Sequence, residues 1–139
     1  MSKVVVYYSR SGNSKQVADL MAKELGVEPI KIVSDMNWNG FFGYMKAGYY
    51  SMMKKTVPIR LEGHLTDDDE IILVAPLWAG DIAVEAHSFV EKHNGSKIDM
   101  VVLSKASELK NQERFKSVHM VKENKTYDSE YLKAVANKI

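Results

Sequence analysis

The chain has 139 residues, of which 45% are hydrophobic, 19 are lysine or arginine and 18 are aspartate or glutamate. This length and composition favour one globular domain over residues 1–139. The net charge of +1 argues against nucleic acid as a partner, because a protein that binds the phosphate backbone needs a strong positive field. The chain contains no cysteine, which excludes disulfides, iron–sulfur clusters and thiol chemistry. Any redox activity must therefore come from a bound organic cofactor or from a cysteine-free metal site.

The first residues show no export or membrane signal. The apolar run at residues 4–8 is too short for the core of a signal peptide, and no other run is long enough to span a membrane. We therefore expect a cytoplasmic protein without a membrane span.

Apolar runs without polar alternation, which are typical of strands buried on both faces, alternate along the chain with helical patterns. In chain order we expect a strand at 4–8, a helix from 13 or 14 to 25, strands at 29–33 and 71–75, a helix at 84–93, a strand at 100–103, a short helix near 109–115, a strand at 118–121 and a helix at 129–138. This alternation predicts βαβ units with crossovers of one hand. The expected fold class is α/β, with a doubly wound, five-stranded parallel sheet of order 2-1-3-4-5 in three α/β/α layers.

Aromatic and methionine side chains are concentrated at residues 38–53, interleaved with glycines. Some of them recur at about 3.6-residue spacing, as in an amphipathic helix that covers a sheet. These are Trp38, Phe41 or Phe42, Met45, Tyr49 and Met52. The remaining aromatic side chains do not fall on that stripe, so we also expect an exposed apolar surface, of the kind that marks a ligand mouth or a partner contact.

A hydroxyl-rich loop follows the first strand and leads into the first helix. It consists of Ser9, Arg10, Ser11, Gly12, Asn13 and Ser14. Backbone N–H groups and the dipole at a helix N-terminus attract phosphate, and a glycine lets the chain approach closely. Walker A and dinucleotide fingerprints do not fit because the loop has a single glycine, and a receiver domain would need acidic residues at the end of the first strand. Taken alone, such a turn is also an ordinary helix N-cap.

A second loop follows the third strand. It consists of Pro76, Leu77, Trp78, Ala79, Gly80 and Asp81. With the order 2-1-3-4-5, strands one and three are neighbours at the switch point of the sheet, so this loop should face loop 9–14 across one crevice. Trp78 offers a flat apolar surface for a ring system, although a tryptophan here could also be a packing residue at the rim. A phosphate loop beside an aromatic surface indicates a nucleotide ligand.

These segments resemble the flavodoxin family, in particular its small single-domain members with an aromatic, glycine-containing segment after the second strand. The likeness rests on residues 5–14, 40–49 and 75–80 and extends over nearly the whole chain. The resemblance implies a flavodoxin-like fold that binds flavin mononucleotide (FMN). It implies that Ser9, Ser11, Asn13 and Ser14, with the amides of Arg10 and Gly12, hold the FMN phosphate, and that Trp78 lies against one side of the isoalloxazine ring.

The loop after the fourth strand departs from the family pattern. Where the family has glycines or an aromatic residue near the ring, this chain has Ser104, Lys105, Ala106 and Ser107. We expect these residues to lie at the cofactor as well. The other side of the ring would then be covered by an aromatic residue from 41–50 or by a partner molecule.

The predicted function is FMN-dependent electron transfer, either as a carrier that docks on a redox protein or as a small reductase that uses NAD(P)H and a small acceptor. Carriers of the family tend to be strongly acidic, so the near-neutral charge shifts weight towards a reductase. The alternative is a flavodoxin-like binding module that has lost flavin and acts through the surface of residues 38–53. The four histidines show no paired spacing, so we expect no metal site, and a homodimer stays open.

Overall fold

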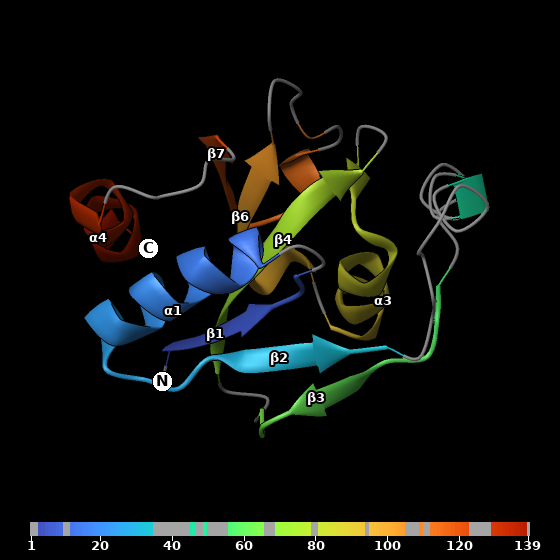
Figure 1. The fold of residues 1–139 in the computed structure, drawn as a ribbon, viewed down its shortest axis with the longest axis horizontal. Helices are drawn as coiled ribbons and strands as arrows, with labels where there is room; N and C mark the ends of the chain where they lie inside the picture. The colour runs from blue at the N-terminus through green and yellow to red at the C-terminus, as the bar shows by residue number, and fades with distance from the viewer. Residues whose placement is uncertain are drawn as a thin grey trace.

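A parallel sheet forms the centre of the fold (Figure 1). The computed structural model describes residues 3–9, 12–34, 45–46, 49, 56–65, 69–78, 81–93, 95–104, 109, 112–122 and 129–138. The parallel strands are, in spatial order, β2 (Ile30–Val33), β1 (Lys3–Tyr7), β4 (Glu70–Trp78), β6 (Ile98–Ser104) and β7 (Ser117–Lys122). These are the five strands expected from the sequence, and they lie in the order 2-1-3-4-5.

Two short strands were not predicted, so the expected count of five strands is too low. Strand β3 (Arg60–Glu62) pairs antiparallel with β2 at the edge of the sheet, and β5 (Asp81–Ile82) pairs antiparallel with the end of β4. Strand β3 contains one apolar residue, Leu61, between two exposed charged residues. A single apolar position produces no periodicity, so an edge strand of this kind leaves no signal in the sequence.

The helices cover both faces of the sheet. On one face, α1 (Asn13–Leu25) and α4 (Ser129–Lys138) pack on inward side chains of the strands, including Val5 and Tyr7. On the other face, α3 (Val84–Lys92) packs on the alternate side chains, including Val6 and Tyr8. Successive strand residues point to opposite faces, so every central strand is buried on both sides. The predicted α/β/α layering is confirmed.

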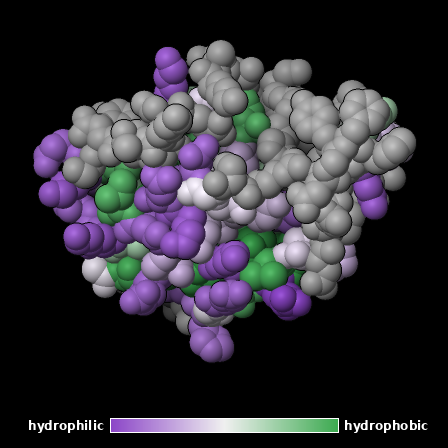
Figure 2. Space-filling model, in the orientation of Figure 1, coloured by the Kyte–Doolittle hydropathy of each residue, from purple (hydrophilic) through white to green (hydrophobic). Residues whose placement is uncertain are grey.

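The helix boundaries follow local signals closely. Helix α1 ends at Gly26, which adopts the left-handed conformation (φ 71°) that favours glycine. The solvent side of α1 is hydrophilic (Figure 2), with Lys15, Gln16 and Lys23 among its exposed residues. No helix among the described residues is long and apolar enough to cross a membrane.

The short helix expected near 109–115 is wrong in length. The structure has a 3₁₀ turn, η2 (Gln112–Arg114), and another, η1 (Gly95–Lys97), before β6. Leu109 and Phe115 are both buried in the core on the α3 face. The apolar spacing of these two residues suggested a longer helix, but the described residues between them form only the turn at 112–114.

A hydrogen bond joins the chain before β3 to α3. Val84 and Ser88 lie one turn apart on that helix and are both almost fully buried. Ser88 Oγ donates to the Val84 carbonyl (2.9 Å) and accepts a hydrogen bond from the Val57 N–H (2.8 Å). The chain that enters β3 is thereby attached to the middle of α3.

Replacing Ser88 with alanine should destabilise the fold. The substitution leaves the buried Val57 N–H without its acceptor, and an unsatisfied buried donor costs about 1–3 kcal/mol. Urea unfolding of Ser88→Ala should show that loss, whereas Lys92→Ala, an exposed substitution on the same helix, should change the free energy of unfolding by less than about 0.5 kcal/mol. Equal effects of the two substitutions would contradict the assigned hydrogen bond.

Candidate functional site

The ends of β1, β4 and β6 lie side by side at the carboxyl edge of the sheet. Tyr7 is in register with Val74, and the Tyr8 N–H donates to the Val74 carbonyl (3.0 Å). Beyond that bond the chain of β1 turns away as loop 9–14, while β4 runs on to Trp78. Because the two strands are parallel neighbours, loop 9–14 and turn 76–81 leave the sheet at the same edge.

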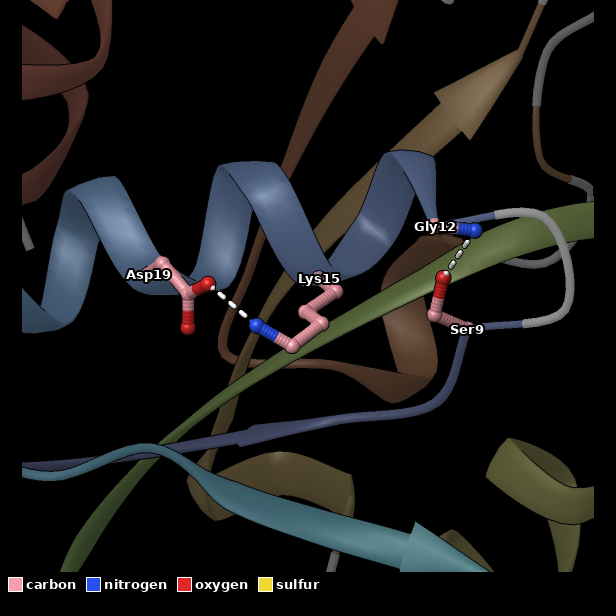
Figure 3. Close-up of polar contacts among 4 residues, drawn as sticks. All are labelled: Ser9, Gly12, Lys15 and Asp19. Carbon is pink, nitrogen blue, oxygen red and sulfur yellow. Dashed lines mark hydrogen bonds and ion pairs between the residues drawn. The ribbon is translucent and has the colours of Figure 1, made fainter.

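A hydrogen bond joins the two ends of the turn between Ser9 and Gly12. Ser9 Oγ accepts from the Gly12 N–H at 2.9 Å (Figure 3). Gly12 is left-handed (φ 97°), and a Cβ placed on it would have no atom within 4 Å. The backbone conformation therefore requires glycine, and the space beside it is open. Arg10 and Ser11, predicted from the sequence for the same loop, lie outside the described residues.

The loop ends at the N-terminus of α1, where the partial positive charge of the helix is not offset by an acidic side chain in its first turn. The Gly12 carbonyl accepts the first helical bond, from Gln16 N–H (3.1 Å). Among the residues that the structure describes, no side chain caps the helix there, and no acidic residue lies in its first turn, whereas α3 and α4 have Glu85 and Glu130 in theirs. The first N–H groups of a helix have no partner within it and hold a partial positive charge. Asn13 and Ser14 are at this end, with Ser14 buried.

The segment expected as an open loop after β4 is a tight hairpin. Leu77 pairs with Ile82, and Trp78 pairs with Asp81. Trp78 is thus the last residue of a strand rather than the tip of a loop, and Ala79 and Gly80 lie outside the described residues, as do the side chains of Trp78 and Asp81. The Pro76 carbonyl accepts from the Ala83 N–H (3.1 Å), which fixes the start of α3 against the end of β4.

The third predicted loop is described only at its first residue. Ser104 is half-buried at the end of β6, one position after Leu103, which is in register with Pro76. Lys105, Ala106 and Ser107 lie outside the described residues. Among the described residues, no three histidine, aspartate or glutamate side chains gather in a way that could hold a metal ion.

The apolar stripe predicted within residues 38–53 is partly wrong. Met45 and Tyr49, one helical turn apart, were expected to pack on the sheet, but they are 55% and 47% exposed. The α3 face of the sheet is already covered by α3, and Ile59 and Leu65 pack against the same core. These two residues therefore add to the exposed apolar surface that the sequence also predicted, while the other aromatic residues of 38–53 lie outside the described residues.

The sequence interpretation missed a charged pair next to loop 9–14. Lys15, in the first turn of α1, donates to Asp19 Oδ2 at 2.8 Å (Figure 3). This hydrogen bond, and then the charge of Asp19, raise the pKa of Lys15 above its ordinary value. Burial raises the pKa of the neighbouring Tyr7, an effect that the charge of Lys15 opposes. The i, i+4 spacing of opposite charges was the signal that could have found the pair.

No family model and no curated protein matches the chain, but solved structures do. A flavoprotein from Bacteroides eggerthii is 15% identical with a TM-score of 0.70, covering 99% of this chain and 97% of that one. A flavoprotein from Lactobacillus acidophilus, crystallised with FMN, is 15% identical with a TM-score of 0.63, covering 87% of this chain and 90% of that one.

A third solved structure that matches the chain is described as a flavodoxin. It is a flavodoxin, WrbA-like protein from Agrobacterium tumefaciens, 15% identical with a TM-score of 0.56, covering 99% of this chain and 96% of that one. The chain has a flavodoxin-like fold. At this low identity the likeness extends to the architecture alone.

Gly12 and Gly26 form a matched pair for testing the backbone of α1 in this flavodoxin-like protein. Both are left-handed and at neither does a Cβ meet an atom within 4 Å. Gly12→Ala and Gly26→Ala should each lower the free energy of unfolding by about 1–2 kcal/mol, because the left-handed conformation disfavours a Cβ. Denaturant unfolding without added ligand measures both losses, and an unchanged stability of Gly12→Ala would contradict the described loop conformation.

Proposed function

We propose that this chain is a cytoplasmic, single-domain FMN-binding redox protein, acting as an electron carrier or as a small FMN-dependent reductase. The observation that supports it most strongly is the N-terminus of α1. In the described part of the chain it has no acidic residue in its first turn and no side-chain cap, and it follows β1, the parallel neighbour of β4. Loop 9–14 would bind the phosphate of a flavin nucleotide, and turn 76–81 would lie against its ring.

The phosphate half fits loop 9–14. Ser9, Asn13 and Ser14 supply hydroxyl and amide donors, and the open space beside Gly12 lets a phosphate approach the backbone. The helix dipole adds a favourable field for the negative charge. Arg10 and Ser11 would complete this set.

The ring half is assigned to turn 76–81 and to residues 104–107. Trp78 would lie against one side of the isoalloxazine ring, and the turn of Ala79 and Gly80 would lie at its edge. Asp81 is paired with Trp78, so its negative charge would lie near the ring and disfavour a negatively charged reduced flavin. When bound, FMN supplies the one-electron and two-electron chemistry that a chain without cysteine lacks.

The Lactobacillus acidophilus flavoprotein supports the proposal, because it was crystallised with FMN on the same fold. The near-neutral charge of this chain favours a reductase over a carrier, since steering towards a charged partner protein would be weak. The electron source would then be NADH or NADPH and the acceptor a small molecule, with the protein as a monomer or a homodimer.

The exposed Met45 and Tyr49 favour a second candidate. An apolar surface of this kind suits a partner, so the chain could instead be a binding module without flavin. A colourless purified protein that does not quench FMN fluorescence would support this candidate and contradict the first.

The glycine pair tests the phosphate assignment. The wild-type protein should quench FMN fluorescence on titration. Gly12→Ala should raise the dissociation constant about tenfold or more, the factor that corresponds to a loss of roughly 1.4 kcal/mol of contacts. Gly26→Ala, which carries the same backbone strain at the far end of α1, should bind FMN like the wild type. Equal weakening by both substitutions would mean that the loss reflects stability rather than the site.

Rapid mixing of the FMN-loaded protein with NADH or NADPH tests the reductase assignment. We expect bleaching of the flavin absorbance at a rate that rises with nicotinamide concentration. A carrier should react poorly with both nucleotides and should instead be reduced by a protein donor. Free FMN at the same concentration is the control for direct reaction in solution.

A further inference from the structure

Lys15 occupies a position that the helix itself does not favour. It is the third residue of α1, next to the partially positive N-terminus, where cations are destabilising and anions are favoured. The only basic residue in the last turn of α1, where a cation would be favourable, is Lys23. The presence of a lysine in the first turn therefore calls for a negative partner.

The partner in the structure is Asp19, one turn further along the helix. Figure 3 shows the Lys15 ammonium directed away from Ser9 and Gly12 and towards Asp19. Helical side chains lean towards the N-terminus, so this contact opposes their usual direction, and a lysine that precedes its acid is the weaker order of an i, i+4 pair. The two side chains are 58% and 44% exposed, so solvent screens their attraction.

A phosphate at loop 9–14 would be a stronger partner for Lys15 than Asp19 is. A phosphate monoester has a charge of about −1.5 to −2 at neutral pH, against −1 for one carboxylate. The described loop residues Ser9, Gly12, Asn13 and Ser14 are all uncharged. The lysine side chain is a flexible four-carbon stem, and turning back along its natural direction would bring the ammonium towards the loop.

We propose that Lys15 is a ligand of the flavin phosphate and that Asp19 competes with the phosphate for it. The pair thereby sets the preference of the site for the phosphorylated flavin over riboflavin. This inference rests on the proposed function, because it concerns the same site.

The test compares FMN with riboflavin, which has the same ring and no phosphate. Dissociation constants of both are measured by fluorescence quenching at low salt for the wild type, Lys15→Met, Asp19→Asn and the double variant. Lys15→Met should weaken FMN binding roughly 5-fold, as expected for two charges interacting through a mostly aqueous path. Riboflavin binding should change less than about 2-fold, since it has no charge for Lys15 to contact. Asp19→Asn should tighten FMN binding about 2-fold to 5-fold, and the double variant should match Lys15→Met.

The controls separate the local contact from net charge. Lys23→Met removes the same charge from the far end of α1 and should leave the preference for FMN unchanged, and Lys15→Arg should retain it. The effect of Lys15→Met should shrink at about 1 M salt, where the screening length falls to roughly 3 Å.

Any of three results would overturn the inference while leaving the proposed function intact. The first is a wild type that binds FMN with a preference over riboflavin that Lys15→Met does not change. The second is weaker FMN binding by Asp19→Asn, and the third is tighter binding by Asp19→Asn that persists in the double variant. Failure of the wild type to bind either flavin would overturn the proposed function, and the role of Lys15 with it.

Discussion

The parallel pairing of β1 with β4 determines where everything else at the candidate site lies. The last bond between these strands joins the Tyr8 N–H to the Val74 carbonyl, after which one chain turns into loop 9–14 and the other continues to Trp78. A shift of one residue in this register would turn the side chains of Val5 and Tyr7 away from α1 and towards α3. Burial on both faces of the sheet opposes that shift, so the core holds the two loops at one edge.

Helix α1 gives up some stability at the same place. An acidic residue in its first turn would be favourable by about 0.3–1 kcal/mol, and the other two long helices have one there. Helix α1 instead begins with a left-handed glycine and places Lys15 near its positive end. Its apolar side, with Val17 and Met21 fully buried, supplies the packing that allows an unfavourable terminus. A bound anion would offset this local cost.

The sequence predicted the large elements because burial on both faces leaves long apolar runs, as at residues 71–75, and because Gly26 marks the end of α1. It did not predict β3, whose single inward residue, Leu61, has no periodic neighbour. It also placed Met45 and Tyr49 against the sheet, since helical spacing shows that a stripe exists but not which surface is left for it. The sequence correctly placed loop 9–14 between the first strand and the first helix, while its role in binding stays a prediction. The hairpin at Trp78 and Asp81 was not predicted, because it depends on pairing between strands.

The attachment of Val57 to α3 bears on how the second side of a flavin ring could be covered. The aromatic segment, residues 38–53, follows β2, which ends at the same carboxyl edge as β1. After this segment the chain reaches Val57, whose N–H is hydrogen-bonded to Ser88 Oγ in α3. The Ala83 N–H, at the start of α3, is hydrogen-bonded to the Pro76 carbonyl near the end of β4. Both ends of the segment are therefore connected to the elements that form the candidate site. Loop 104–107 offers neither an aromatic residue nor a glycine, so coverage of the second ring side by an aromatic residue of 41–50, or by a partner molecule, stays a prediction.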